Sequence, residues 1–259
     1  MNKMELDKIY MEDCLTGMDR IPDGSIDAVI CDLPYGTTQC EWDKIIPFPE
    51  MWEQINRVIK HNAAIVLFGA EPFSSTLRLS NIRAYKYDWI WNKKRPTGQL
   101  NAKKQPMRQH EYIHVFYYSQ PTYNPVMHEN RLSRQFVGTV QKSNKQSDNY
   151  GEQYDYHSNI TNDSKSYPRS IIEQTAVVGN GKEKVGHPTQ KPVALLEYLV
   201  STYTNKGDIV LDFCMGSGTT AVACINKYRH FIGFEKKKEF YEMAVNRIKN
   251  VLREPKLAM

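Results

Sequence analysis

Two things are scarce in this 259-residue sequence: cysteine and long runs of apolar residues. The five cysteines are scattered without a CxxC pair, so neither a zinc site nor a disulfide framework is expected. No apolar run approaches the roughly 18–20 residues that span a bilayer. The first residues, MNKMELDK, contain no apolar signal-peptide core. These absences predict a cytoplasmic protein with reduced thiols, no membrane contact and no metal.

Apolar and charged residues occur in globular proportions. Hydrophobic residues make up 41% of the sequence and charged residues 24%, which excludes an intrinsically disordered chain. The length suits one large α/β domain, or one domain with a sizeable insertion. A formal net charge of +5 permits a polyanionic partner without requiring one.

Short apolar runs alternate with helix-like stretches in the first and last thirds of the sequence. The expected strands are 25–31 (ending at Asp32), 63–68, 87–91, 112–117, 208–213 and 229–235. The expected helices are 49–60, 193–203, 219–227 and 238–252. This alternation predicts a doubly wound, mainly parallel α/β sheet with helices on both faces.

Residues 119–186 have a different character. They are rich in Asn, Gln, Ser, Tyr, Lys and Gly and lack long apolar periodicity. A structureless loop of that length is uncommon inside a compact domain unless it is functional or mobile. We interpret the stretch as an insertion or a small subdomain.

A glycine-containing turn links an expected strand to an expected helix at residues 210–220. Glycine lets backbone approach a ligand closely, and a helix N-terminus presents unpaired N–H groups to an anion. Glu235 closes the next strand, nineteen residues after Gly216, which is the placement for binding a ribose diol. The pattern predicts a nucleoside-type cofactor with an anionic end. The alternative is a turn whose glycines serve packing only.

The segment Asp32, Leu33, Pro34, Tyr35 follows the first expected strand. In open α/β sheets, ligands bind at the carboxyl ends of strands. The Asp32 carboxylate and the Leu33 carbonyl can each accept a hydrogen bond from an amino group, and Tyr35 offers a flat face to a nucleobase. The alternative is an ordinary Asp-x-Pro turn with a half-buried tyrosine.

Taken together, these segments resemble the S-adenosylmethionine-dependent DNA amino-methyltransferases. Asp32–Tyr35 resembles the catalytic D/N/S-P-P-Y/F/W motif of that family, and 212–220 resembles its cofactor loop. The catalytic motif comes first, which is the order of the circularly permuted beta group. Segments 187–192, 9–15 and 89–117 also resemble that group. The departure is Leu33, where the family most often has proline; the position contributes mainly its backbone carbonyl.

The resemblance implies a Rossmann-like methyltransferase fold and a set of site residues. Residues 1–118 would form the catalytic half, 119–186 the target-recognition insertion and 187–259 the cofactor-binding half. The catalytic residues would be Asp32, Leu33, Pro34 and Tyr35. The cofactor-binding residues would be Asp13, Cys14, Asp32, Thr189, Gln190, Lys191, Asp212, Phe213, Gly216, Ser217, Gly218, Thr219 and Glu235, with Lys191 able to neutralise the methionine carboxylate.

The implied reaction is methyl transfer from S-adenosylmethionine to N6 of an adenine flipped out of double-stranded DNA, since Asp in the first motif position resembles the adenine enzymes. Cytosine N4 is the alternative acceptor. From another class, the alternative is a catalytically inactive DNA-binding module with the same fold. A homodimer and a cognate restriction endonuclease are compatible partners. Basic residues between two expected strands would contact phosphates: Lys93, Lys94, Arg95, Lys103, Lys104 and Arg108.

Overall fold

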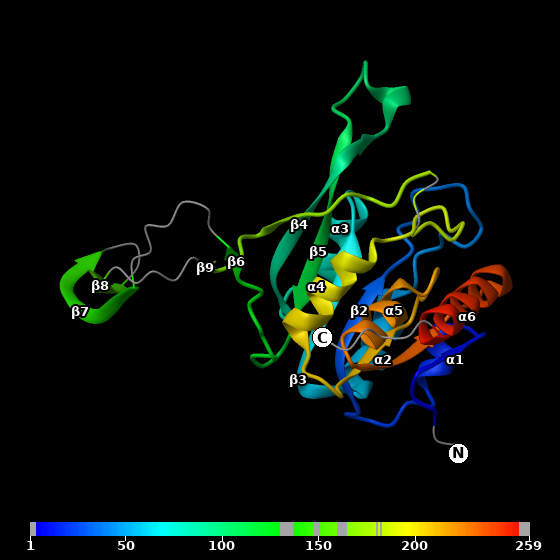
Figure 1. Cartoon of the computed structure of the whole chain (residues 1–259), viewed down its shortest axis with the longest axis horizontal. Helices are drawn as coiled ribbons and strands as arrows, with labels where there is room; N and C mark the ends of the chain where they lie inside the picture. Colours follow the sequence, from blue (N-terminus) through cyan, green and yellow to red (C-terminus); the bar gives the residue numbers. More distant parts are fainter. Residues whose placement is uncertain are drawn as a thin grey trace. The chain divides into compact units, whose positions relative to one another are not determined.

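The computed structural model describes residues 4–129, 137–147, 151–159, 165–179, 181 and 183–253 (Figure 1). The helices are α1 (Cys14–Met18), α2 (Phe48–Val58), α3 (Phe73–Ser80), α4 (Val193–Tyr203), α5 (Thr219–Asn226) and α6 (Lys238–Arg253), with a 3₁₀ turn η1 at Gln99–Asn101. The main-sheet strands are β1 (Lys8–Tyr10), β2 (Ile26–Asp32), β3 (Ile59–Gly69), β4 (Tyr85–Thr97), β5 (Arg108–Phe116), β10 (Ile171–Glu173), β11 (Ile209–Asp212) and β12 (His230–Phe234).

The main sheet has the strand order β1-β12-β11-β2-β3-β5-β4-β10. Strand β5 runs antiparallel to β3 and β4, and the other neighbouring pairs in this sheet are parallel. A hairpin joins β4 to β5 through Gly98, whose φ is 92°, and a short connection of this kind requires antiparallel strands. The prediction of a mainly parallel α/β sheet is confirmed, and β4 and β5 are longer than predicted.

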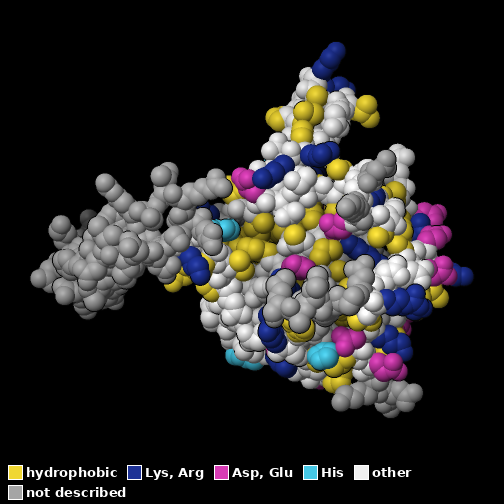
Figure 2. Space-filling model, viewed as in Figure 1, with side chains coloured by type: hydrophobic (Ala, Val, Ile, Leu, Met, Phe, Trp, Pro, Cys, Tyr) yellow, Lys and Arg dark blue, Asp and Glu magenta, His cyan; other side chains and the backbone are white. Residues whose placement is uncertain are grey.

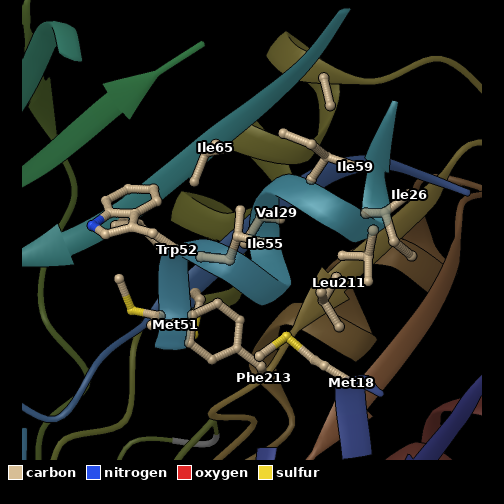
Figure 3. Packing of buried hydrophobic residues seen from close by; sticks show 14 of the residues in the cluster. Met18, Ile26, Val29, Met51, Trp52, Ile55, Ile59, Ile65, Leu211 and Phe213 are labelled. Carbon is tan, nitrogen blue, oxygen red and sulfur yellow. The ribbon is translucent and has the colours of Figure 1, made fainter. Parts of the chain in front are cut away.

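In the part of the chain that the structure describes, three helices pack against each face of the sheet, and the period-two alternation of the strands supplies both apolar surfaces. Helices α1, α2 and α3 share one hydrophobic cluster, whereas α4, α5 and α6 share the other. On β3, Ile65 and Leu67 belong to the first cluster, and Val66 and Phe68 belong to the second. Figure 3 shows the first, in which Trp52 from α2 lies over the sheet. Burying such a side chain stabilises the fold by about 1.5–3 kcal/mol.

The strand order reverses direction at the pair β2 and β11. The chain leaves β11 through α5 toward β12 on one side, and leaves β2 through α2 toward β3 on the other. The two strands are parallel neighbours, so their carboxyl ends open a crevice between the two crossovers. This crevice is where the fold places a ligand site.

Part of the predicted insertion forms a separate compact unit, residues 125–169. It contains the antiparallel pairs β6 (His128–Glu129) with β9 (Lys165–Ser166), and β7 (Val137–Ser147) with β8 (Gly151–Asn159). The predicted insertion, 119–186, is wider than this unit because β10 pairs with β4 in the main sheet. Insertion residues 130–136, 148–150, 160–164, 180 and 182 lie outside the described residues.

Within the described residues, the helices are too short or too polar to cross a membrane.

Candidate functional site

A cavity of about 950 Å³ opens at the carboxyl ends of β2 and β11. Asp32 is the last residue of β2, and Asp212 is the last residue of β11. The cavity also reaches the start of α1, the loop after β11 and the end of β12. All predicted catalytic residues line it, as do the predicted cofactor residues apart from Gly218. The sheet topology therefore brings together side chains that are as much as 222 residues apart in the sequence (Asp13 and Glu235).

Asp32 lies at one end of this cavity. The Tyr35 hydroxyl donates a hydrogen bond to Asp32 Oδ1 at 2.9 Å. The Leu33 side chain is 5% exposed and packs in the cluster shared by α1, α2 and α3. The leucine that departs from the family pattern therefore fills part of the core.

The Tyr35 ring is stacked on Phe73, with the ring centroids 5.2 Å apart and the planes 25° apart. Phe73 opens α3 and therefore holds the tyrosine from one face. The Lys191 ammonium lies 5.9 Å from the centroid of the same ring. These contacts restrain the orientation of the Tyr35 ring.

Lys191, just before α4, extends into the same end of the cavity. Its Nζ lies 2.5 Å from Asp32 Oδ2 and 3.4 Å from Glu111 Oε2. Lys93 Nζ in turn lies 3.1 Å from Glu111 Oε1. The structure thus gives Lys191 two carboxylates from this chain as partners, where the sequence predicted a cofactor carboxylate.

These neighbours shift the protonation equilibria of the buried groups. Burial raises the pKa of Asp32, although the Lys191 cation works against that shift. Burial alone would lower the pKa of Lys191, but the carboxylates of Asp32 and Glu111 outweigh it and raise that pKa. Burial likewise opposes ionisation of Glu111, but Lys191 and Lys93 lower its pKa. The side chains of Asp32, Lys191, Glu111 and Lys93 thus form a row in which carboxylates and amines alternate.

The other end of the cavity surrounds the glycine turn after β11. Gly216 and Gly218 have φ values of 52° and 76°, a conformation that favours glycine. A Cβ on Gly216 would lie 3.3 Å from His187 Nε2, so this turn is also tight against its neighbour. Glu235 Oε2 accepts the Gly216 N–H at 2.8 Å, and Glu235 Oε1 accepts the Lys237 N–H at 2.8 Å. Burial raises the pKa of Glu235.

Further predicted cofactor residues complete this end. The Asp13 side chain accepts the Leu15 N–H at 3.0 Å, which caps α1, and also pairs with Lys236. Asp212 accepts the Cys214 N–H at 3.1 Å, and burial raises the pKa of Asp212 to about 6. Cys14, Phe213, Ser217, Thr189 and Gln190 line the same wall.

Arg247 of α6 supports the turn from behind, and the sequence analysis did not single it out. It is 9% exposed, and its Nη1 donates to Thr219 Oγ1 at 2.9 Å and to the Ser217 carbonyl at 3.2 Å. Thr219 Oγ1 also donates to the Lys191 carbonyl at 3.2 Å, which ties the turn to the segment before α4. Only the packing of α6 brings this arginine close, so no local sequence signal indicates it.

Asp43 organises the loop that follows Tyr35, and it was also missed. The residue is 7% exposed. Its carboxylate accepts hydrogen bonds from the N–H groups of Gly36, Thr37 and Thr38 at 2.8–3.0 Å, and from the Thr38 hydroxyl. Burial opposes ionisation, but these donors outweigh it and lower the pKa of Asp43. A side chain seven residues after Gly36 thereby fixes the backbone next to the catalytic segment.

Replacing Asp43 with asparagine is expected to lower the free energy of unfolding by about 1–3 kcal/mol, because the amide NH₂ faces buried N–H donors. Because the pKa of Asp43 is lower in the folded protein than in the unfolded one, its carboxylate stabilises the fold at pH values above the unfolded-state pKa. That contribution is lost as the pH falls through the folded-state pKa. The difference from wild type should therefore shrink in acid. Urea unfolding across pH measures it, with Glu41→Gln, an exposed change in the same loop, as the control. A variant as stable as wild type at neutral pH contradicts this role.

The predicted phosphate contacts divide into two groups. Lys93 is 7% exposed and lines the cavity, so the structure corrects its assignment to the DNA surface. Lys94 forms an exposed pair with Glu173 at 3.0 Å. The others are exposed on the β4–β5 hairpin, where Figure 2 shows basic side chains at the tip and near the base: Arg95, Lys103, Lys104 and Arg108.

The cofactor end fits a nucleoside with an anionic or zwitterionic tail. It offers a half-buried carboxylate with further lone pairs at Glu235, a positive-φ turn, and the N-terminus of α5. Among the described residues there is no group of three or more His, Cys, Asp or Glu side chains that could hold a metal.

Comparison with known proteins identifies relatives of the whole fold. Residues 26–246 match the model of a family described as DNA methylase. The chain is 28% identical to the type II methyltransferase M.HpaI of Haemophilus parainfluenzae, across 93% of this chain and 74% of that protein. It is also 28% identical to the type II methyltransferase M.BglII of Bacillus subtilis, across 93% and 69%.

Solved structures agree in fold. The M1.HpyAVI–SAM complex matches with a TM-score of 0.61 and 24% identity, covering 93% of this chain and 98% of that one. The PvuII DNA methyltransferase, described as cytosine-N4-specific, matches with a TM-score of 0.67 and 16% identity, covering 96% and 92%.

Proposed function

The chain belongs to the DNA methylase family, as an S-adenosylmethionine-dependent amino-methyltransferase of the beta group, and from this premise we propose that it methylates N6 of an adenine extruded from double-stranded DNA. The observation that carries the proposal is the cavity in which Asp32 and Tyr35 share one space with the glycine turn and Glu235. An acceptor for an amino group and a site for the methyl donor thus lie in one enclosure.

Asp32 and Leu33 would act on the target amino group directly. The amino nitrogen of adenine is a poor nucleophile because its lone pair is delocalised into the ring. Hydrogen bonds from the amino group to the Asp32 carboxylate and the Leu33 carbonyl would draw the nitrogen toward a tetrahedral shape. The carboxylate would also stabilise the positive charge that develops there, and is placed to receive the proton the nitrogen sheds.

S-adenosylmethionine, when bound, would supply an electrophilic methyl group on a sulfonium with a thioether as its leaving group. The chain's part is alignment, because in-line displacement depends strongly on it. Glu235 would accept the ribose hydroxyls, and Asp13 with the Cys14 backbone would meet the adenine edge. The turn at Gly216 and the segment at Thr189 would meet the methionine end.

Adenine is favoured over cytosine by Asp32 itself, since aspartate at the first motif position resembles the adenine-N6 enzymes. A base inside a duplex cannot reach an enclosed pocket, so it must be flipped out at a cost of a few kcal/mol. The exposed basic hairpin between β4 and β5 would contact phosphates. We assign base recognition to the predicted insertion, whose side-chain types read base edges.

The proposal is tested with purified protein, unmethylated genomic DNA and methyl-labelled S-adenosylmethionine, followed by nucleoside mass analysis. We expect N6-methyl-2′-deoxyadenosine as the labelled nucleoside. N4-methylcytosine would transfer the proposal to the alternative acceptor. If the protein binds the cofactor but neither base carries label, the alternative of a catalytically inactive DNA-binding module is favoured.

Two substitutions of Tyr35 separate its ring from its hydroxyl. Tyr35→Ala removes the stacking face, and base–aromatic stacking is worth about 1–3 kcal/mol, so KM for DNA should rise about 5- to 100-fold while kcat also falls. Tyr35→Phe keeps the ring and loses only the bond to Asp32, so KM should stay close to wild type. Steady-state kinetics at saturating cofactor distinguish them. Equal KM values in the two variants would refute the stacking role.

A further inference from the structure

A row of alternating charges lies beside the catalytic carboxylate and extends beyond what the reaction above uses. It comprises Asp32, Lys191, Glu111 and Lys93, and each contact in it is between opposite charges. The exposed fractions of Lys191 and Lys93 are 8% and 7%. Buried charges of this kind are costly and persist where they are paired. Two buried lysines paired with two partly buried carboxylates in one cavity call for a reason beyond stability.

We propose that Glu111 and Lys93 are positioning residues that control how strongly Lys191 engages Asp32. Glu111 holds the ammonium between two carboxylates, and Lys93 limits the pull of Glu111. Asp32 thereby keeps lone pairs available to the target amino group. This inference rests on the proposed function of Asp32, and it adds two residues to which the sequence analysis gave no catalytic role.

The strand geometry places these groups on one face of the sheet. Glu111 lies opposite Trp91 in the antiparallel pair of β5 and β4, and Lys93 lies two residues beyond Trp91 on the same face. Because β5 runs antiparallel, its first residues lie at the edge where β2 ends. The antiparallel strand is thus what brings Glu111 to the catalytic edge.

Aromatic rings restrain the shared lysine. Lys191 Nζ lies 5.3 Å from the ring centroid of Phe68 and 5.9 Å from those of Trp91 and Tyr35. The hydrogen bond to Asp32 Oδ2, the longer ion pair with Glu111 and these cation–π contacts together restrain the ammonium. Without Glu111, the full attraction of Lys191 would fall on Asp32 and weaken it as an acceptor.

Asp32 also faces ionisable groups from other elements. The Tyr35 hydroxyl comes from the segment after β2, the Asp212 carboxylate from β11, and the Cys31 thiol from β2 itself. The test therefore changes only Glu111 and Lys93 and leaves these three groups intact. Any shift in pH dependence then reports on the charge row.

The two single variants should shift the acid limb of kcat/KM in opposite directions. Transfer needs ionised Asp32, so activity is lost as pH falls through the pKa of Asp32. Glu111→Gln removes a negative charge and moves that limb to lower pH. Lys93→Gln removes a positive charge and moves it to higher pH. Because a displacement of about 1 Å can cost about 100-fold, kcat should fall about 10- to 100-fold in Glu111→Gln.

The double variant Glu111→Gln/Lys93→Gln has lost one charge of each sign, so its acid limb should return toward wild type. Glu173→Gln breaks the exposed pair between β10 and Lys94 and is the matched control, with an unshifted limb. If Glu111→Gln does not fold, the shift in Lys93→Gln decides alone. If the wild type is active and the acid limbs of its kcat/KM profile and those of the single variants coincide, the inference is overturned. If the wild type is inactive, the proposed function is overturned.

Discussion

Replacing Asp32 with asparagine is expected to reduce methyl transfer at least about 1000-fold. The amide keeps the shape of the carboxylate but presents NH₂ hydrogens toward the target amino group and the Tyr35 hydroxyl. It also removes the anion that stabilises charge on the attacking nitrogen. Lys191, 2.5 Å away, is left with Glu111 as its carboxylate partner. Single-turnover transfer to genomic DNA measures the effect.

The control is the same substitution at an exposed carboxylate, Asp23→Asn, whose side chain is 78% exposed beside Arg57. It should retain wild-type activity. Calorimetric titration with S-adenosylmethionine should show that Asp32→Asn still binds the cofactor, because the contacts at Glu235 and Gly216 are intact. Near wild-type transfer by Asp32→Asn would remove the carboxylate from the mechanism.

The parts of the site that could be predicted from sequence are those encoded by neighbouring residues. Asp32 and Tyr35 lie three residues apart at a strand end, and the turn at Gly216 directly follows a strand. Glu235 could be predicted as well, because the next parallel strand must end at the same edge. Helices α2, α4, α5 and α6 followed from apolar spacing, and α4 begins and ends where predicted, whereas the short helices α1 and α3 were not predicted.

The parts that could not be predicted depend on pairings between distant segments. Lys191 and Asp32 are 159 residues apart, and their contact requires the segment before α4 to pass over the end of β2. Lys93 looked like a phosphate contact because it begins a basic run, and only the β4–β5 register turns it inward toward Glu111. Arg247 lies on an otherwise ordinary amphipathic helix, so its burial against the turn has no signature in the sequence.

The position of Lys191 differs from the predicted one, and this changes which residues belong to the catalytic end and which to the cofactor end of the cavity. With its ammonium held by Asp32 and Glu111, this lysine belongs to the catalytic end, and the cofactor end depends on backbone donors and on Glu235. A carboxylate there has to serve two purposes. It already accepts the N–H groups of Gly216 and Lys237, and we propose that its remaining lone pairs accept the ribose hydroxyls.

Glu235→Gln should therefore raise the Kd for S-adenosylmethionine about 10- to 100-fold. Hydrogen bonds to a charged group contribute about 1.5–3 kcal/mol, and each 1.4 kcal/mol is tenfold in affinity. The amide NH₂ would in addition face a backbone N–H that now donates to the carboxylate, loosening the turn. Calorimetric titration measures the Kd, and Glu239→Gln, at a side chain 72% exposed on α6, is the matched control. If Glu235→Gln binds the cofactor with a Kd within twofold of wild type, the ribose must bind elsewhere. If the Kd rises while kcat at saturating cofactor stays normal, Glu235 acts in cofactor binding and Asp32 in methyl transfer.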